Sequence, residues 1–420
     1  EVSLVLDVSG SMAGSKLTAL KPAAKNFVDK IFNSAETGKV SMSLIVYDNQ
    51  VSAGADLLNY FSKTSEHTKS NCIEFDPADF KTTTMRVKTG APYQRNAHFD
   101  AISSYYYDGE AIYDPHCPVA AVDTVSEETR AIIPFSNSPT TLKTRIDSLV
   151  ADGNTSIDLG AKWGVALLDP STKPVVQAMI AGNKLPSNFS ERPYDYNGAG
   201  DKKSLKVMVL MTDGENTEEY KLKSPYNSSA NSVFFRTNKA ASNSTNLNDY
   251  SIYNAATNKY YSFFYSKWGT VPFGSGAGTD STEIKISNPK TFYGATVVPW
   301  KDLYQTFNAD HVAYMMSLTG LYTRSSWYNT TVSTLNGTTK DNQTKDICAA
   351  AKAKDKGIVI YTIAFQAGVN GKAVLNSCAS LTADPNDSAT SVNYYEATTL
   401  SIDKVFSGIV NSINKLRLTH

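Results

Sequence analysis

Four short runs of apolar residues constrain the fold of this chain more than any other feature. Each run is apolar almost throughout, rather than at alternate positions, and turn residues follow it. This pattern is typical of strands that are buried on both faces of a parallel sheet. The four runs are Val2–Leu6, Val40–Tyr47, Leu205–Met211 and Gly357–Phe365.

Stretches of helical periodicity alternate with these runs. In the first, apolar residues recur at helical spacing from about Ser15 to Phe32, and Pro22 is expected to kink that helix or delay its start. The alternation predicts a doubly wound α/β fold, in which helices flank a mostly parallel, Rossmann-like sheet. Further helices are expected at Thr140–Leu149, after Thr155, at Lys345–Lys356 and at Ser401–Leu416.

Two long stretches break this alternation. Residues 56–130 and 217–344 are rich in Tyr, Asn, Ser and Thr, and residues 170–203 form a smaller interruption. Loops of such length are seldom structureless inside a compact protein. We therefore expect ordered insertions on the rim of the sheet. The core is then formed by residues 1–55, 131–216 and 345–420.

The charge of the chain is balanced. Its 420 residues include 40 basic and 40 acidic side chains, with no long run of either sign. Nucleic acid is therefore not expected as a partner, because its binding needs clustered Lys and Arg. No stretch reaches the roughly 18 consecutive apolar residues that span a bilayer. An apolar run directly follows Glu1, so we expect a processed or truncated product, attached to a membrane only through a missing upstream anchor.

The chain has four cysteines, at spacings that fit no zinc-binding template. Four cysteines allow three pairings, and the sequence alone does not choose among them. We favour Cys72 with Cys117 and Cys348 with Cys378, because each pair is local to one segment. The alternative is four buried, reduced thiols. Disulfides would place the protein outside the reducing cytosol.

Oxygen-bearing side chains follow two of the apolar runs. Asp7, Ser9 and Ser11 follow the first run, and Asp213 follows the third. Between them in sequence, Thr155 lies on a loop that opens a helix. Because ligands of open α/β sheets bind beyond the carboxyl ends of the strands, we expect these side chains to converge on one spot.

This set of side chains predicts a site for one divalent metal ion. Two carboxylates and three hydroxyls are hard oxygen ligands, which suit Mg²⁺, with Mn²⁺ or Ca²⁺ as alternatives, better than zinc or copper. Each piece alone is more often an ordinary turn, so the prediction depends on their joint occurrence after strands. The two carboxylates only cancel the double charge of the ion, and the three hydroxyls are neutral. A bound ion would therefore remain electrophilic towards an incoming anion.

Asp7-x-Ser9-x-Ser11, Thr155 and Asp213 resemble the metal-ion-dependent adhesion site (MIDAS) of von Willebrand factor A (vWA) domains. In that family the two serines coordinate the ion directly. The threonine and the second aspartate do so directly or through water, and a carboxylate of the ligand usually completes the shell. The resemblance implies a vWA fold and a non-enzymatic role in binding a protein ligand.

A narrower resemblance covers more of the chain. Asp152–Leu168, Lys206–Asn216, the segments around Cys348 and Cys378, and the end of the chain resemble the TadG group of tight-adherence (Flp) pilus assembly proteins. In that group the vWA domain follows a transmembrane helix and faces the periplasm or the outside. The resemblance implies an adhesion or assembly module at the periplasmic face of the inner membrane or the cell surface. Its partners would be pilus components or further copies of itself.

Other functions fit the sequence less well. A released adhesin or a self-assembling filament component would use the insertions for contacts between subunits. A metal-assisted hydrolase would need a general base, and the sequence offers no candidate beyond the metal ligands themselves. The five histidines are scattered and form no metal or nucleophile motif. The favoured cysteine pairs argue against a cytosolic subunit of a chelatase.

Overall fold

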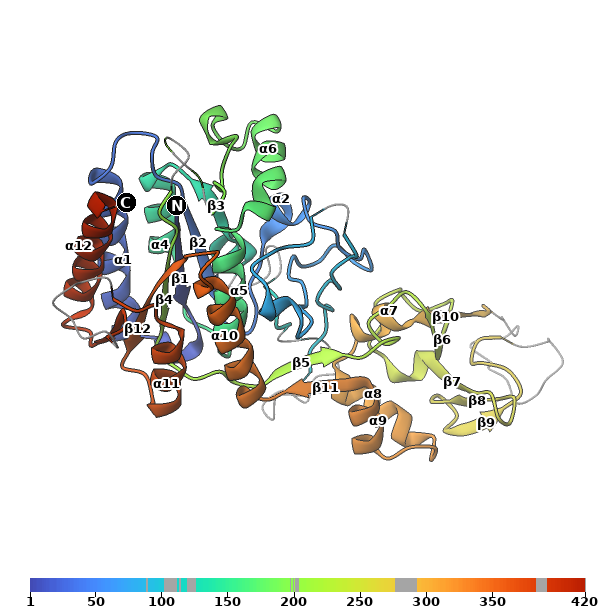
Figure 1. Cartoon of the computed structure of the whole chain (residues 1–420). Helices are drawn as coiled ribbons and strands as arrows, with labels where there is room; N and C mark the ends of the chain where they lie inside the picture. Colours follow the sequence, from blue (N-terminus) through green and yellow to red (C-terminus); the bar gives the residue numbers. More distant parts are fainter. Residues whose placement is uncertain are drawn as a thin grey trace.

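The computed structural model describes residues 1–87, 90–101, 112, 115–118, 126–196, 198, 200, 204–275, 293–382 and 391–419. Its central strands are β1 (Val2–Asp7), β2 (Met42–Tyr47), β3 (Ile133–Ser136), β4 (Val207–Thr212), β12 (Val359–Phe365) and β13 (Tyr394–Ala397). They form one sheet in the order β13-β12-β4-β1-β2-β3 (Figure 1). All of them run parallel except β3, which pairs antiparallel with β2 at one edge. The expected mostly parallel α/β sheet is confirmed.

The burial of the strands explains which of them the sequence pattern predicted. Every residue of β1, β2 and β4 is buried, so these strands are apolar at nearly every position. In register, Val2 lies between Met42 of β2 and Val207 of β4. The two edge strands β3 and β13 were not predicted, because both are short and partly exposed and carry polar residues.

Helices cover both faces of the sheet (Figure 1). Buried side chains of α1 (Ser15–Asn33), α4 (Pro139–Ser148) and α12 (Ile402–Thr419) pack together on one face. Those of α5 (Ile157–Ala166), α10 (Gly337–Lys352) and α11 (Val369–Cys378) pack on the other. Pro22 lies within α1 and does not delay its start. In the part of the chain that is described, no helix combines the length and the apolarity needed to cross a membrane.

The start of α10 differs from the prediction, which placed this helix at Lys345–Lys356. The helix begins earlier, at Gly337. Its first turns were missed because the residues that they bury are polar, namely Lys340, Gln343 and Thr344. A search for apolar periodicity cannot find a helix face of this kind.

A lobe is inserted between β4 and α10 (Figure 1). Two antiparallel strands, β5 (Glu219–Leu222) and β11 (Val332–Leu335), lead into and out of it, and we call this pair the stalk. Beyond the stalk, the described residues form a five-stranded sheet and three α-helices around a hydrophobic core that is separate from the two cores of the central sheet. These elements are β6 (Asn231–Thr237), β7 (Tyr250–Asn254), β8 (Lys259–Ser262), β9 (Lys267–Gly269), β10 (Ala295–Pro299), α7 (Trp300–Tyr304), α8 (Ala309–Leu318) and α9 (Arg324–Thr331).

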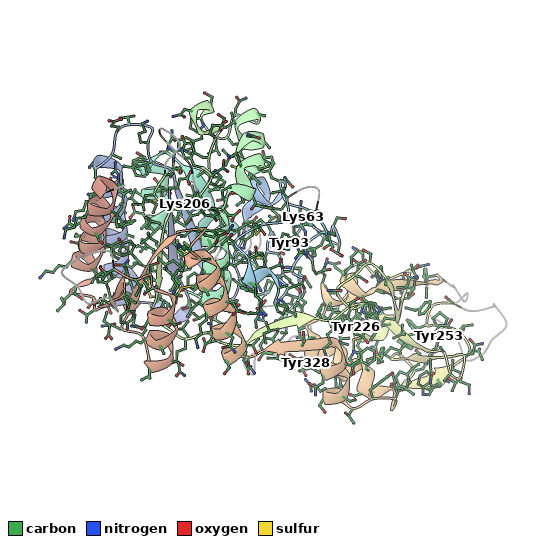
Figure 2. All side chains as sticks on the ribbon, in the orientation of Figure 1. Lys63, Tyr93, Lys206, Tyr226, Tyr253 and Tyr328 are labelled. Carbon is green, nitrogen blue, oxygen red and sulfur yellow. A yellow bond between two sulfur atoms is a disulfide. The ribbon has the colours of Figure 1, made fainter. Side chains whose placement is uncertain are left out.

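The first insertion packs against this lobe. Phe99 and Ala101 belong to the lobe's hydrophobic core, although the lobe itself starts more than a hundred residues later. Tyr328, which Figure 2 shows on the side of the lobe nearest the sheet, donates a hydrogen bond of 2.8 Å to the carbonyl oxygen of Ala101. Among the described residues outside the lobe, three further α-helices are α2 (Gly54–Leu58), α3 (Glu127–Arg130) and α6 (Lys173–Ala181).

All four cysteines are paired. Cys72 bonds Cys117 within the first insertion, and Cys348 of α10 bonds Cys378 of α11. These are the two pairs that the sequence favoured. The second disulfide ties together two helices on the same face of the sheet.

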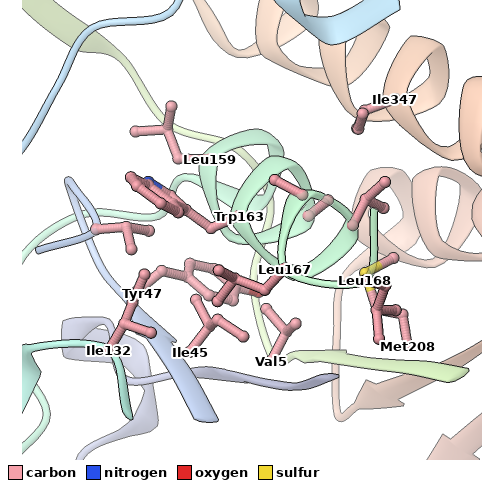
Figure 3. Close-up of a cluster of buried hydrophobic side chains, with 14 of the residues drawn as sticks. Val5, Ile45, Tyr47, Ile132, Leu159, Trp163, Leu167, Leu168, Met208 and Ile347 are labelled. Atoms are coloured by element: carbon pink, nitrogen blue, oxygen red, sulfur yellow. The ribbon is translucent and has the colours of Figure 1, made fainter. Parts of the chain in front are cut away.

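Helix α5 lies directly against the sheet, as the close-up in Figure 3 shows. Trp163 on this helix is buried, and Gly160 faces Tyr47 of β2. A Cβ atom added at Gly160 would lie 2.5 Å from the Tyr47 ring. The ring cannot easily move away, because its hydroxyl donates a hydrogen bond of 2.9 Å to the carbonyl oxygen of Met211. Glycine therefore allows this close approach of helix and strand.

We predict that Gly160→Ala destabilises the protein, by about 1–3 kcal/mol, because the added methyl group overpacks the core. The matched control is Gly408→Ala in α12, where an added Cβ meets no atom within 4 Å. That control should stabilise by about 0.5–1 kcal/mol through helix propensity. Urea unfolding of both variants checks the prediction, and a Gly160→Ala protein as stable as the control would contradict it.

Candidate metal centre

The candidate metal centre lies where the order of the strands reverses. From β1 the chain continues to β2 on one side, whereas β4 lies on the other side of β1. Asp7 is the last residue of β1, and Asp213 follows the last residue of β4. Parallel strands side by side end at the same edge, so the fold brings the two aspartates together at the switch point.

Asp7 is buried and is held by both strand ends. One of its carboxylate oxygens, Oδ1, accepts a hydrogen bond of 2.8 Å from the backbone N–H of Ser9. The other, Oδ2, accepts one of 2.5 Å from the hydroxyl of Thr212. Thr212 was not predicted as a site residue, although it directly precedes Asp213. Its hydroxyl fixes the Asp7 carboxylate from the neighbouring strand.

A row of oxygen atoms continues from Ser9 to Asp213. The hydroxyls of Ser9 and Ser11 lie 3.2 Å apart. The hydroxyl of Ser11 then donates a hydrogen bond of 2.7 Å to Oδ1 of Asp213. A short 3₁₀ turn, Gly10–Met12, gives Ser11 this position. Ser11 is exposed, whereas Ser9 and Asp213 are buried, so solvent reaches the row from the Ser11 side.

The loop before α5 brings Thr155 to the same place. This loop is tied to the one after β1, because the N–H of Gly10 donates a hydrogen bond of 2.8 Å to the carbonyl oxygen of Gly153. A Cβ atom added at Gly214 would lie 3.3 Å from Oγ1 of Thr155 and 3.6 Å from Oγ of Ser11. Both hydroxyls therefore converge on Gly214, and all five residues singled out in the sequence lie around one spot.

The described chain also places a cation at this spot. Nζ of Lys16, in the first turn of α1, lies 2.5 Å from Oδ2 of Asp213. The lysine side chain is 23% exposed, and that of Asp213 is fully buried. In the sequence nothing distinguishes Lys16 from the other lysines of the same helix, Lys21, Lys25 and Lys30. Only the fold shows that this one meets a predicted metal ligand.

The side chains fit a small, hard dication. Two carboxylates and three hydroxyls supply oxygen atoms alone, as Mg²⁺, Mn²⁺ and Ca²⁺ prefer. Among the described residues, no group of three or more His, Cys, Asp or Glu side chains is placed to hold a metal. The ammonium of Lys16 opposes a cation at this spot, and we expect it to weaken binding.

Comparison with known proteins gives only distant similarities. No protein-family model matches the chain, and no curated protein matches it. Among solved structures it is similar to the vWF domain of the type V pili tip protein Mfa5 from Porphyromonas gingivalis. The identity is 14%, with 98% of this chain and 94% of that chain covered and a TM-score of 0.35.

Two further solved structures are similar at the same level. For the PilB minor pilin from Streptococcus sanguinis the identity is 14%, with 98% of this chain and 60% of that chain covered and a TM-score of 0.34. For the pilus adhesin RrgA from Streptococcus pneumoniae it is 13%, with 100% and 44% covered and a TM-score of 0.34. The chain thus spans less than two thirds of these two proteins. The strand order and register given above define its fold.

A pocket of about 860 Å³ lies at the opposite edge of the sheet, where β1 and β4 begin. Its lining includes Glu1, Arg192, Lys206 and Arg417. Lys206 pairs there with Glu1, and both side chains are buried. None of the predicted metal ligands lines this pocket, so the pocket and the candidate metal centre are separate places on the sheet.

Burial raises the pKa of Asp7 most, the negative charge of the nearby Asp213 raises it further, and the pKa reaches about 6. The hydrogen bonds from Ser9 and Thr212 act in the opposite direction but do not outweigh the burial. Two adjacent carboxylates in a buried place therefore favour either a proton or a cation. The same property gives the site its expected response to pH.

We predict that Lys16→Met strengthens Mg²⁺ binding, by about three- to tenfold, because it removes a partly screened positive charge beside Asp213. Isothermal titration calorimetry measures the affinity. Lys25→Met, on the same helix, is the matched control, because Lys25 pairs with the exposed Asp147 away from the site. Unchanged or weaker binding in Lys16→Met would contradict the prediction.

We also predict that Mg²⁺ affinity falls below about pH 6. A bound metal would need the ionised Asp7 carboxylate, and a pKa of about 6 favours the protonated form below that pH, so the loss of affinity should approach tenfold per pH unit. Titrations between about pH 5 and pH 7.5, in a buffer that does not bind metal, measure it. An affinity that stays constant over this range would show that Asp7 ionises with an ordinary pKa or does not bind the ion.

Proposed function

We propose that this chain is a metal-dependent, non-enzymatic binding module of a bacterial surface pilus system. The observation that carries the proposal is the convergence of Asp7, Ser9, Ser11, Thr155 and Asp213 at the switch point of the sheet. These residues would hold one divalent cation. We expect Mg²⁺, with Mn²⁺ or Ca²⁺ as alternatives. The bound ion would supply a coordination position for a carboxylate oxygen of a protein ligand.

The charges around the site support a carboxylate as the ligand group. The two aspartates balance the double charge of a divalent ion, and Lys16 adds a positive charge that remains. An anion that approaches from the exposed Ser11 side would meet a site of net positive charge. Lys16 would then weaken metal binding but favour the complex with a carboxylate.

The setting of the site supports a role outside the cytosol. Two disulfides are typical of proteins in oxidising compartments. The assignment to a pilus system comes from the sequence resemblance to the TadG group. The lobe starts only a few residues after Asp213, so it stands close to the site and would help to select the partner.

The first test is thermal unfolding of chelator-stripped protein with and without Mg²⁺, Mn²⁺ or Ca²⁺. An ion at 100 times its dissociation constant should stabilise the folded protein by about 2.7 kcal/mol. Asp7→Ala should abolish the metal-induced shift. Asp147→Ala, which removes an exposed carboxylate elsewhere, should keep it. Wild-type protein that no ion stabilises would contradict the proposal.

A second measurement on the same protein addresses the ligand. Acetate is the simplest carboxylate probe, and Mn²⁺ reports its own bound water through the relaxation of water protons. We expect acetate to lower this relaxation in the Mn²⁺-loaded protein by displacing water, and to do so less well in Lys16→Met. Acetate without effect in either protein would argue against a carboxylate ligand while leaving the metal site intact.

A further inference from the structure

The backbone of Thr155 is hydrogen-bonded to the segment in which the chain leaves the sheet and enters the lobe. Its backbone N–H donates a hydrogen bond of 2.9 Å to the hydroxyl of Thr217. In return, the N–H of Thr217 donates one of 3.0 Å to the carbonyl oxygen of Thr155. Thr217 lies two residues before β5, the first strand of the stalk. The backbone of a predicted metal ligand is thus paired with the entry to the lobe.

The exit from the lobe holds the same residue. Lys340, in the first turns of α10, is fully buried, and its ammonium donates to the carbonyl oxygen of Thr155 at 3.1 Å. The ammonium also donates to the hydroxyl of Ser156 at 2.6 Å. Helix α10 begins at Gly337, two residues after β11 ends. Each strand of the stalk is therefore close in sequence to a residue that is hydrogen-bonded to Thr155, namely Thr217 beside β5 and Lys340 after β11.

Asn216 joins these contacts into one unit. Its side-chain oxygen accepts a hydrogen bond of 2.8 Å from the N–H of Ile157, the first residue of α5. Its side-chain nitrogen donates one of 2.8 Å to the carboxylate of Asp341 in α10. A Cβ atom at Gly337 would overlap the carbonyl oxygen of Asn216, so the entry and the exit of the lobe are in close contact. A shift of the stalk would move these groups together.

The other predicted ligands are held differently. Asp7 is fixed by Ser9 and Thr212 at the strand ends, and Asp213 by Ser11 and Lys16. All of these residues belong to the sheet ends or to α1 and its preceding loop. Thr155 is therefore held by residues next to the stalk, whereas the aspartates are held by residues of the sheet ends and of α1 with its preceding loop.

We propose that Thr217 and Lys340 are positioning residues for Thr155, so that the pairing of the stalk sets the metal affinity of the site. This inference rests on the proposed function. It adds that the lobe and the metal centre are energetically coupled. Coupling of binding free energies is reciprocal, so a metal ion that uses Thr155 also stabilises the stalk.

The sharpest test compares two substitutions at Thr217. Thr217→Val keeps the shape but removes the hydroxyl that accepts from Thr155, whereas Thr217→Ser keeps the hydroxyl. We expect Mn²⁺ affinity, measured by electron paramagnetic resonance of the free ion, to fall about tenfold in Thr217→Val, as for other residues that orient a metal ligand. Thr217→Ser should bind as the wild type does. Thr217 is half-buried, so both variants should fold.

A second pair of variants tests the other side of the stalk. Lys340→Met should weaken Mn²⁺ binding in the same direction, and Lys345→Met, on an exposed position of the same helix, should not. Lys340 lies 4.0 Å from the buried carboxylate of Asp158, so its loss also affects stability. The unfolding midpoint of each variant is therefore measured in the presence of chelator, together with its Mn²⁺ affinity. If Lys340→Met does not fold, the comparison of Thr217→Val with Thr217→Ser decides the test.

Hydrogen exchange supplies a readout that a purely structural role would not move. Adding Mn²⁺ to the wild type should slow amide exchange in β5 and β11, and this slowing should be lost in Thr217→Val. Thr217→Val that binds Mn²⁺ as tightly as Thr217→Ser would overturn the inference while the metal site stands. Wild-type protein that binds no metal would instead remove the proposed function, and the inference with it.

Discussion

Two buried carboxylates that repel one another are the constraint on which the rest of the site depends. Neighbouring parallel strands deliver Asp7 and Asp213 to one edge of the sheet, where burial makes a second negative charge costly. The surroundings compensate with hydroxyls and with the ammonium of Lys16. A divalent ion would compensate more fully, and this is the physical reason for proposing a cation here.

The large insertion leaves the sheet at the same edge, where β1 and β4 end with the two aspartates. The chain turns away from the sheet immediately after Asp213 and returns through α10, which packs on α5 behind Thr155. The insertion between the second aspartate and this helix therefore begins and ends beside Thr155. Placed at the other edge, beside the pocket lined by Arg192 and Arg417, the same lobe would have no such contact.

The sequence predicted the parts of the fold that depend on local pattern. Strands buried on both faces, such as β1 and β4, are continuous apolar runs and were found close to their true ends. The position of Asp7 and Asp213 just after apolar runs likewise predicted that they lie at one edge of the sheet, and the structure places them together there. The partly exposed strands β3 and β13 and the polar face of α10 have no such signal and were missed.

The supporting residues of the site could not be predicted in this way. Lys16 is separated from Asp213 by 197 positions, and Lys340 from Thr155 by 185, so nothing local distinguishes them from other lysines. Thr217 lies in a polar stretch where threonine is common. Their roles depend on how distant segments pack. A single sequence therefore indicates which side chains have the chemistry of ligands but not which others orient them.

Phe99 and Ala101 pack in the lobe's core, and this limits how the lobe can be gained, lost or exchanged in evolution. A lobe whose core was complete in itself could be gained, lost or exchanged between proteins as a cassette. This one could not, because its removal would leave Phe99 without cover and its transfer would leave a hole in its own interior. The two insertions are therefore expected to vary together in evolution, as one unit that the chain contributes in two pieces.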